Sequence, residues 1–576
     1  MLPHLAETLE CLEIILLLDP ALHSVFRQDR HNRQSASPLR RRHKRRVGCT
    51  SSALDANVAL DSSWHANLWI YRASGTLSPI PNAKSHEGSW VPQNSKETID
   101  SGNGHGRFSW KMATLVSFLL LLPCFWQSRI QSIDLSSHIY NTWLASLIAQ
   151  KQAPGLWIAR QSSNVLFDLM LAWLFPFFGA AVAQKIAVGT AVLIFSWGAI
   201  LLISRGRPKN WWFLLPSVAV FSYGFIFHAG FFNFYLGMGI CFWYLAFVLS
   251  GGWRIRCLVT PLLLLAWTAH PMPVVWAVGL ALYIAVAERL PPQGRLLLLT
   301  AGAAAMVEVH FLLVTRYQCI WSLDQAWFAT GAKQLMLFGR MYEIPCWLFL
   351  AAWAMLFWRH AIACRWRNVA LDMGFQLWLL TAIAVVMIPA AIAFPLYAAP
   401  FNFVSLRLSL AAGIMLGAFL GDVQPKGHER VILTLGALIF FGLVFRDARK
   451  LNLMEDKLDA ALEQVPAKSR VIGILRVPSR DFSPAEHAVD RACIGRCFSY
   501  ANYEPSTGQF RVRAEAGNPI VMADYADVYS VELGRYRVQA GDLPVFLIYL
   551  CGPDRQQVCS RELHGGEVVG SVARAN

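Results

Sequence analysis

Long apolar runs separated by short polar stretches fill the middle of the chain, residues 112–446. Most of these runs approach the ~20 residues that a helix needs to cross the hydrocarbon core of a membrane. The pattern predicts a mainly α-helical, polytopic membrane domain. The expected spans, about eleven, are residues 113–127, 183–203, 211–227, 232–250, 256–270, 272–288, 294–314, 342–358, 372–390, 404–421 and 430–446.

The two ends of the chain have a different pattern. Residues 1–111 are polar and basic, with the run Arg40–Arg46 and much Ser, Asn and Gly, so we expect a disordered N-terminal arm or a start-site artefact ahead of Met112. Residues 447–576 begin with an amphipathic linker helix at 451–462. They then carry strand-like alternations at 470–475, 510–513 and 545–549, which predict a small C-terminal α+β domain.

Composition and charge support the membrane interpretation. The 55% hydrophobic content nearly excludes a purely soluble protein. The net charge of +15 could indicate nucleic-acid binding, but the basic residues mostly separate apolar runs, as in cytoplasmic loops. We therefore expect the lipid bilayer and no nucleic acid as partner. The loop charges place the N-terminus inside and the C-terminal domain outside, and we expect a bacterial cytoplasmic membrane.

One apolar segment does not fit the alternation of loop charges. Residues 165–178 could span the membrane, but counting them would invert every later loop, and Asp168 would cost ~2.5–3.5 kcal/mol at the bilayer centre. We interpret this segment as an interfacial or re-entrant helix packed against protein. It then belongs to a long outer loop, residues 127–182.

Cysteines in the C-terminal domain agree with an outer location. Cys493, Cys497, Cys551 and Cys559 form an even set, which in an oxidising compartment favours disulfides. Structural zinc and free thiols are the alternatives, although the usual Cys-x-x-Cys spacing of zinc sites is missing. No metal-binding motif is visible, and the cofactor stays open, with a divalent cation among the options.

Familiar catalytic motifs are missing from the chain. It contains no Gly-x-x-x-x-Gly-Lys loop, no Gly-x-Ser-x-Gly elbow and no His-Glu-x-x-His pair, so ATP-driven transport by this chain alone, hydrolase and metalloprotease functions lack support. Polar residues at the ends of spans are then the candidates for function.

The start of the outer loop carries the most informative pattern. Asp134 follows the first span, an apolar stripe at helical spacing suits a helix lying on the membrane surface, and Pro154-Gly155 makes a turn. The stripe consists of Leu135, Ile139, Trp143, Leu147 and Ile148. This arrangement resembles the first outer loop of the GT-C class of integral-membrane glycosyltransferases. The resemblance implies a polyprenyl-phosphate-linked sugar as donor and a loop carboxylate, here Asp134, as base or acceptor-positioning group.

Three residues are catalytic candidates. Asp134 could remove a proton from an acceptor hydroxyl, because partial desolvation raises the pKa of a carboxyl group. Alternatively, it solvates the loop or caps the following helix. His138 lies one helical turn further on the same face, and Asp168 needs a buried partner, which could be merely structural.

Four further residues are candidates for substrate binding. His228 and His270 sit at outer helix ends beside small or helix-breaking residues, and Arg316 and Arg407 place guanidinium groups at the outer ends of spans. An arginine there can hold a phosphate in bidentate fashion. Helix packing for the histidines and snorkelling for the arginines are the alternatives.

These patterns favour a membrane glycosyltransferase that uses a polyprenyl-phosphate donor on the extracytoplasmic face. A transporter with an intramembrane His/Asp relay is the main alternative, although no internal repeat is visible in residues 183–446. A cell-envelope assembly protein without catalysis is the third.

Overall fold

The computed structural model describes residues 110–205, 211–475, 483–552 and 556–571. The expectations for the N-terminal arm, its basic cluster and the start site concern residues 1–109 almost entirely and lie outside the described part.

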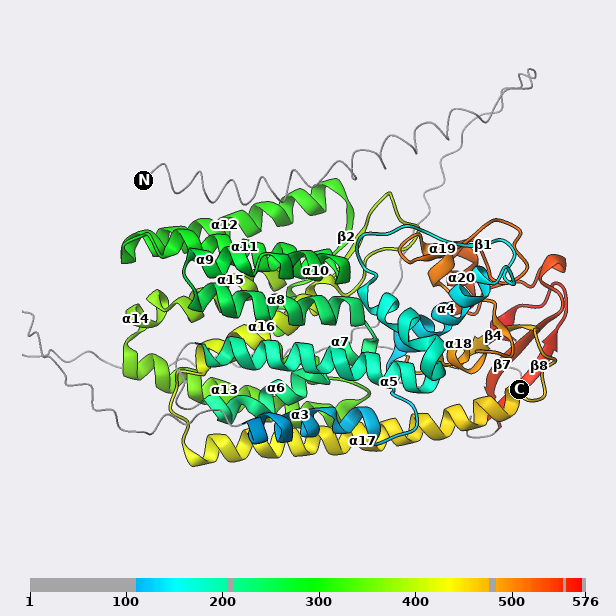
Figure 1. Ribbon diagram of the computed structural model, residues 1–576, viewed down its shortest axis with the longest axis horizontal. Helices are drawn as coiled ribbons and strands as arrows, with labels where there is room; N and C mark the ends of the chain where they lie inside the picture. Colours follow the sequence, from blue (N-terminus) through cyan, green and yellow to red (C-terminus); the bar gives the residue numbers. More distant parts are fainter. Residues whose placement is uncertain (1–109, 206–210, 476–482, 553–555, 572–576) are drawn as a thin grey trace, which may run out of the picture. The chain divides into compact units, whose positions relative to one another are not determined.

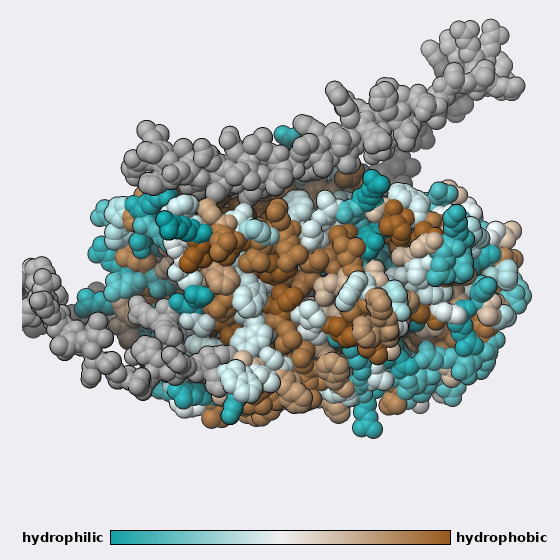
Figure 2. All heavy atoms as spheres, viewed as in Figure 1, coloured by the Kyte–Doolittle hydropathy of each residue, from teal (hydrophilic) through white to brown (hydrophobic). Residues whose placement is uncertain are grey.

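A bundle of helices forms the larger part of the described chain (Figure 1). Within the described residues, six segments are long and apolar enough to cross a membrane: Leu166–Ser204, Trp211–Ala229, Phe232–Ser250, Pro292–Arg316, Arg340–Cys364 and Gly427–Leu462. Hydrophobic residues cover the middle of the bundle on the face shown in Figure 2, and hydrophilic residues gather toward its two ends. The count of eleven spans stays a prediction, because several of the expected spans are shorter helices.

The bundle helices follow one another in chain order. They are α3 (Trp110–Phe125), α5 (Leu166–Ser204), α6 (Leu215–Ser222), α7 (Phe225–Ala229), α8 (Phe232–Ser250), α9 (Trp253–Leu258), α10 (Pro261–Ala269), α11 (Pro271–Ala287), α12 (Pro292–Arg316), α13 (Glu343–Cys364), α14 (Trp366–Leu371), α15 (Met373–Met387), α16 (Val404–Leu420) and α17 (Gly427–Leu462). A short antiparallel pair, β2 (Gln318–Ile320) and β3 (Ala391–Ala393), joins two of the connections.

Helix α5 contains the segment that did not fit the loop charges. Gly179 has a positive φ of 65° inside α5 and kinks it into a short first limb and a longer second limb. Residues 166–178 form the first limb, which packs against protein on one side through Phe167, Leu171 and Leu174. The segment is thus the beginning of a kinked helix rather than a separate element.

Helix α17 corrects the predicted boundary between the last span and a linker helix. The residues expected to form the two elements make one continuous helix of 36 residues (Figure 1). At ~1.5 Å per residue such a helix is longer than the ~30 Å hydrocarbon core. Because no Gly or Pro interrupts residues 443–462, nothing in the sequence stops the helix.

The C-terminal region folds around a four-stranded sheet in the order β5-β4-β7-β8. Strand β4 (Arg470–Ile474) is parallel to β5 (Phe498–Ser499) and β7 (Val545–Cys551), and β8 (Gln557–Leu563) is antiparallel to β7. Helices α18 (Ala488–Ala492), α19 (Glu504–Thr507) and α20 (Tyr525–Glu532) lie in the connections. The strand predicted at 510–513 is β6 (Val512–Ala514), but it pairs with β1 (Leu156–Ile158), which precedes α5, instead of joining this sheet.

Helix α4 (Ile133–Ala149) lies between the bundle and the C-terminal domain. Leu135 and Ile139 belong to the core of the bundle, whereas Tyr140 and Leu144 belong to a core that includes the C-terminal domain. The expectation of a helix lying on the membrane surface is therefore wrong for the first half of α4. Protein contacts this half on opposite faces and buries Leu135 and Ile139 completely, whereas the rest of the apolar stripe is partly buried.

Candidate functional site

Asp134 lies in the first turn of α4, where the backbone of α4 comes close to the backbone of the turn after α7. Gly230 ends α7 with a positive φ of 89°, and a Cβ atom there would lie 2.6 Å from the Asp134 backbone nitrogen. The nearby hydroxyl of Ser132 donates to the Phe227 carbonyl over 2.7 Å. The turn after α7 thus holds the beginning of α4 in place, with the Asp134 side chain still 15% exposed.

One turn further along α4, His138 forms a partly buried ion pair with the first limb of α5. Its Nδ1 lies 2.8 Å from Oδ1 of Asp168, and the amide of Asn233 donates to the other oxygen of that carboxylate over 2.8 Å. Asn233 also accepts from the backbone nitrogen of Phe167 over 2.8 Å, so it fixes the N-terminal end of α5. The partner that a carboxylate at this position requires is therefore His138, with Asn233 as support.

Asp134, His138 and Arg407 line one cavity, here called the Asp134 cavity, whose space of about 400 Å³ is partly open to solvent. Arg407, in the first turn of α16, stacks 3.9 Å from the centre of the Phe231 ring, and its buried Nε has no partner among the described residues. His270 also lines the cavity, but its Nδ1 accepts from the backbone nitrogen of Met272 and caps α11. The cavity thus combines a carboxylate with a cation available to a ligand.

The C-terminal domain completes the surroundings of this cluster. Glu504, at the start of α19, places Oε1 3.6 Å from Nδ1 of His138. The side chains of Asn502 and Asn141 bond to each other, with Asn502 donating over 2.8 Å. His487 lies 3.7 Å from Oδ1 of Asp134 and stacks on Tyr503.

Burial and mutual charge shift the pKa values of this cluster. Burial raises the pKa of Asp134 to about 6, although His138, Arg407 and the Tyr503 hydroxyl oppose the shift. Burial raises the pKa of Glu504 to about 8, so its carboxyl group is mostly protonated at neutral pH. For His138, burial favours the neutral ring, but Asp168, Glu504 and Asp134 outweigh it and raise the pKa to about 10. His138 is therefore an imidazolium, and Asp134 titrates close to neutrality.

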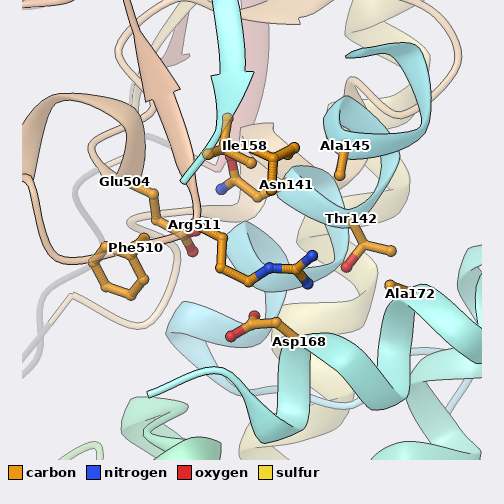
Figure 3. Close-up of a pocket in the computed structure, with 10 residues that line it drawn as sticks. Asn141, Thr142, Ala145, Ile158, Asp168, Ala172, Glu504, Phe510 and Arg511 are labelled. Carbon is orange, nitrogen blue, oxygen red and sulfur yellow. The ribbon is translucent and has the colours of Figure 1, made fainter. Parts of the chain in front are cut away.

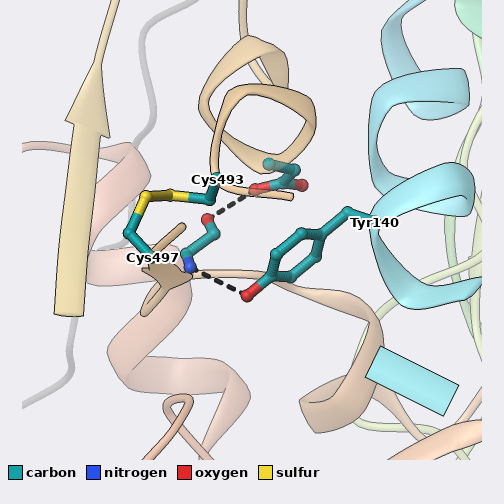
Figure 4. Close-up of a disulfide and its surroundings, with 5 residues drawn as sticks. Tyr140, Cys493 and Cys497 are labelled. Atoms are coloured by element: carbon teal, nitrogen blue, oxygen red, sulfur yellow. Dashed lines mark hydrogen bonds between the residues drawn. A yellow bond between two sulfur atoms is a disulfide. The ribbon is translucent and has the colours of Figure 1, made fainter. Parts of the chain in front are cut away.

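A cysteine pair lies beside these residues. Cys493 and Cys497 lie at disulfide distance with Cα atoms 4.6 Å apart, between α18 and β5 (Figure 4). Next to them, the Tyr140 hydroxyl accepts from the backbone nitrogen of Ser499, and the Ser499 hydroxyl donates to Asp490. Cys551 and Cys559 form the second pair at disulfide distance, with Cα atoms 6.0 Å apart. The four cysteines singled out from the sequence therefore form two pairs between near neighbours in the chain.

Five of the seven predicted site residues come together, and two do not. Asp134, His138, Asp168, His270 and Arg407 all lie in or directly beside the Asp134 cavity. His228 is buried against the Gln131 carbonyl and lines a different cavity, of about 280 Å³. Arg316 is exposed at the end of α12 and lines neither cavity.

The sequence patterns did not point to the residues that the C-terminal domain supplies. His487, Glu504 and Arg511 lie more than 300 residues from Asp134 in the chain and follow no spacing relative to it. Asn233, which bridges Asp168 and the start of α5, was not among the predicted site residues either. Glu504 and Arg511 could have been found from the pairing of residues 512–514 with residues 156–158. A single sequence does not reveal which strands pair.

No group of three or more His, Cys, Asp and Glu side chains in the described part of the chain has a metal-binding arrangement. The cofactor therefore stays open. No protein-family model, curated protein or solved structure matches this chain.

Proposed function

We propose that this chain is a membrane glycosyltransferase that moves a sugar from a polyprenyl-phosphate donor to an acceptor hydroxyl at the outer membrane face. The observation that carries the proposal is the Asp134 cavity, which holds a carboxylate with a pKa near 6 and the guanidinium of Arg407. A general base works best when its pKa lies near the operating pH.

In the proposed reaction, Asp134 acts on the acceptor hydroxyl and Arg407 acts on the phosphate of the donor. Asp134 takes the proton of the acceptor hydroxyl while the oxygen attacks the anomeric carbon of the donor. The bond from that carbon to the phosphate oxygen breaks, and the phosphate leaves with the electron pair. Arg407 then stabilises the charge that grows on the leaving phosphate.

His138 acts on Asp134 rather than on the substrate in this proposal. Its imidazolium is held by Asp168 and favours the ionised form of Asp134 through charge. The two carboxylates thus have different roles, with Asp168 fixing a cation and Asp134 available to accept a proton.

Replacing Asp134 by Asn tests the proposal. In proteoliposomes supplied with a panel of polyprenyl-phosphate hexoses, Asp134→Asn should lower transfer by at least the ~10²-fold expected for removal of a general base. Donor binding should persist, because the amide keeps the shape of the side chain. Arg407→Ala should instead weaken donor binding as well as rate, because it removes a contact present before the chemistry begins.

The matched control is Glu515→Gln, an exposed carboxylate in a turn of the C-terminal domain. It should transfer sugar at the unmodified rate. Undiminished transfer by Asp134→Asn would remove the base role and with it the main support for a transferase.

A proton-coupled transporter is the second candidate. The closely spaced series Asp134, His138, Asp168 and Glu504 favours it, because such groups can relay protons. A relay predicts that Asp168→Asn abolishes proton movement into liposomes when no sugar donor is present. Glycosyl transfer predicts no proton movement under those conditions.

A further inference from the structure

A second cavity lies across the His138–Asp168 pair from the Asp134 cavity. The space between its lining residues measures about 340 Å³ and is partly open to solvent, and Thr142, Asp168, Glu504 and Arg511 line it (Figure 3). Phe510 lines both cavities and forms part of the wall between them. This second space is here called the Arg511 cavity.

Arg511 brings a positive charge into this cavity without a counter-charge of its own. Its guanidinium group points toward Asp168 and Thr142 (Figure 3), but it makes no hydrogen bond or ion pair with any described residue. Asp168 is already paired with His138 and Asn233. The charge of Arg511 is thus available to an anionic ligand.

Glu504 supplies a second group suited to an anion. It is 2% exposed, and its Oε1 makes no hydrogen bond to a described residue, with Nδ1 of His138 3.6 Å away. With a pKa of about 8 it carries a proton at neutral pH and can donate a hydrogen bond to a phosphate oxygen. A buried polar atom without a partner calls for an explanation, and a ligand supplies one.

An apolar stripe begins beside the cavity and runs along the first limb of α5. Ala172 lines the cavity, and Leu169, Trp173 and Phe177 are 46%, 69% and 72% exposed at spacings of four residues. Residues four apart lie on one face of a helix. An isoprenoid chain attached to a phosphate in the cavity could lie along this face.

We propose that the Arg511 cavity binds the phosphate group of an isoprenoid lipid, with Arg511 and Glu504 on the phosphate and the chain along Leu169, Trp173 and Phe177. Resting on the proposed function, this lipid carries the acceptor. Donor and acceptor then each have their own cation, Arg407 and Arg511, on either side of Phe510. The acceptor hydroxyl reaches Asp134 past the Phe510 ring.

Binding of farnesyl phosphate to the purified full-length protein tests this inference without any turnover. The Arg407→Ala background removes the cation of the Asp134 cavity, so that binding at the second cavity is measured. In this background, Arg511→Ala should weaken binding about tenfold or more, as expected for the loss of a charge-assisted hydrogen bond. Arg535→Ala, an exposed arginine of the same domain, should leave binding unchanged.

The probe itself separates the lipid from a free anion. Farnesol, which lacks the phosphate, and inorganic phosphate, which lacks the chain, should both bind far more weakly than farnesyl phosphate. Trp173→Ala combined with Phe177→Ala should weaken farnesyl phosphate binding and leave inorganic phosphate binding unchanged. Equal binding of inorganic and farnesyl phosphate would overturn the lipid assignment.

The pH dependence of farnesyl phosphate binding tests the role of Glu504 independently. Binding should fall as the pH rises through about 8, because Glu504 then loses the proton it donates. Glu504→Gln keeps a hydrogen-bond donor and should flatten this decline, although His138, Asp134 and Asp168 face the same carboxyl group and keep their own charges. A decline of the same steepness in Glu504→Gln would contradict the role of Glu504.

The two proposals fail separately. Asp134→Asn should bind farnesyl phosphate normally, so loss of turnover in that variant concerns the base alone. Unchanged binding in Arg511→Ala, or in Arg511→Gln if the alanine variant does not fold, would overturn the second site and leave the base assignment intact.

Discussion

At the scale of residues, the cluster around α4 depends on groups that hold protons more tightly in the folded chain than in water. Glu504 and His138 have pKa values of about 8 and about 10, against ordinary values of 4.5 and 6.5. Burial dominates the shift of Glu504, and the surrounding carboxylates outweigh burial for His138. A group whose pKa is raised on folding stabilises the folded state at pH values below its ordinary pKa. This contribution is lost as the pH rises through the pKa of the group in the folded protein.

The raised pKa values of Glu504 and His138 predict that the free energy of unfolding falls as the pH rises from about 6.5 to about 8. Both Glu504 and His138 contribute over that window, on the order of 1 kcal/mol per pH unit for each group. His487, whose pKa burial lowers to about 4, acts in the opposite direction only below its ordinary value of 6.5. Thermal unfolding of the detergent-solubilised protein across this range measures the effect.

Glu504→Gln serves as the comparison in the same experiment. It should show a shallower decline, because it removes one of the two titrating groups. Stability that rises over this window in the unmodified protein would contradict the protonated state of Glu504.

At the scale of elements, the turn between α7 and α8 positions the start of α4. Gly230→Ala should destabilise the protein by about 1–3 kcal/mol, the cost of a residue held in a sparsely populated backbone region, and should also displace Asp134. A Cβ atom at Gly230 would come within 3 Å of three Asp134 atoms, so the new methyl group has no room. Thermal stability and sugar transfer would both be measured.

Gly279→Ala is the matched control for this substitution. Gly279 lies within α11, and a Cβ atom added to it would meet nothing within 4 Å. Alanine is better than glycine by about 1 kcal/mol inside a helix, so this variant should be at least as stable as the unmodified chain. Equal behaviour of the two variants would show that the turn does not constrain α4.

At the scale of the whole molecule, α17 and α4 join the bundle to the C-terminal domain. Arg129, which precedes α4, forms ion pairs with Asp456 and Asp459 on the last turns of α17. Arg491 of the C-terminal domain pairs with Glu455 of the same helix over 2.6 Å. These contacts explain how residues from the bundle and the C-terminal domain reach one cluster.

The orientation of the molecule predicts the state of its thiols. If the C-terminal domain lies outside the cytoplasm, mass spectrometry without reduction should find Cys493 bridged to Cys497 and Cys551 bridged to Cys559. Cys257, an exposed cysteine in the bundle, should be alkylated in the same sample and shows that the reagent works. Full alkylation of the four C-terminal cysteines in the native protein would place that domain in a reducing compartment.

The sequence alone determined those features that depend on short stretches of chain. Apolar runs of sufficient length must become helices in lipid, so the helical bundle follows from residues close together in the chain. The placement of Asp134 just after the first span and of His138 one turn later is equally local. Two strands of the C-terminal domain, at 470–474 and 545–551, also follow their local alternation.

Only the tertiary structure decided which distant residues meet. The pairing of β1 with β6 brings Glu504 and Arg511 to α4, and the packing of α5 against α4 sets Asp168 against His138. The alternation of residues 510–513 marks a strand but not its partner, because a strand edge offers the same backbone N–H and C=O groups to every possible partner. The choice of partner strand depends on packing interactions throughout the molecule, and no single segment of the sequence specifies them.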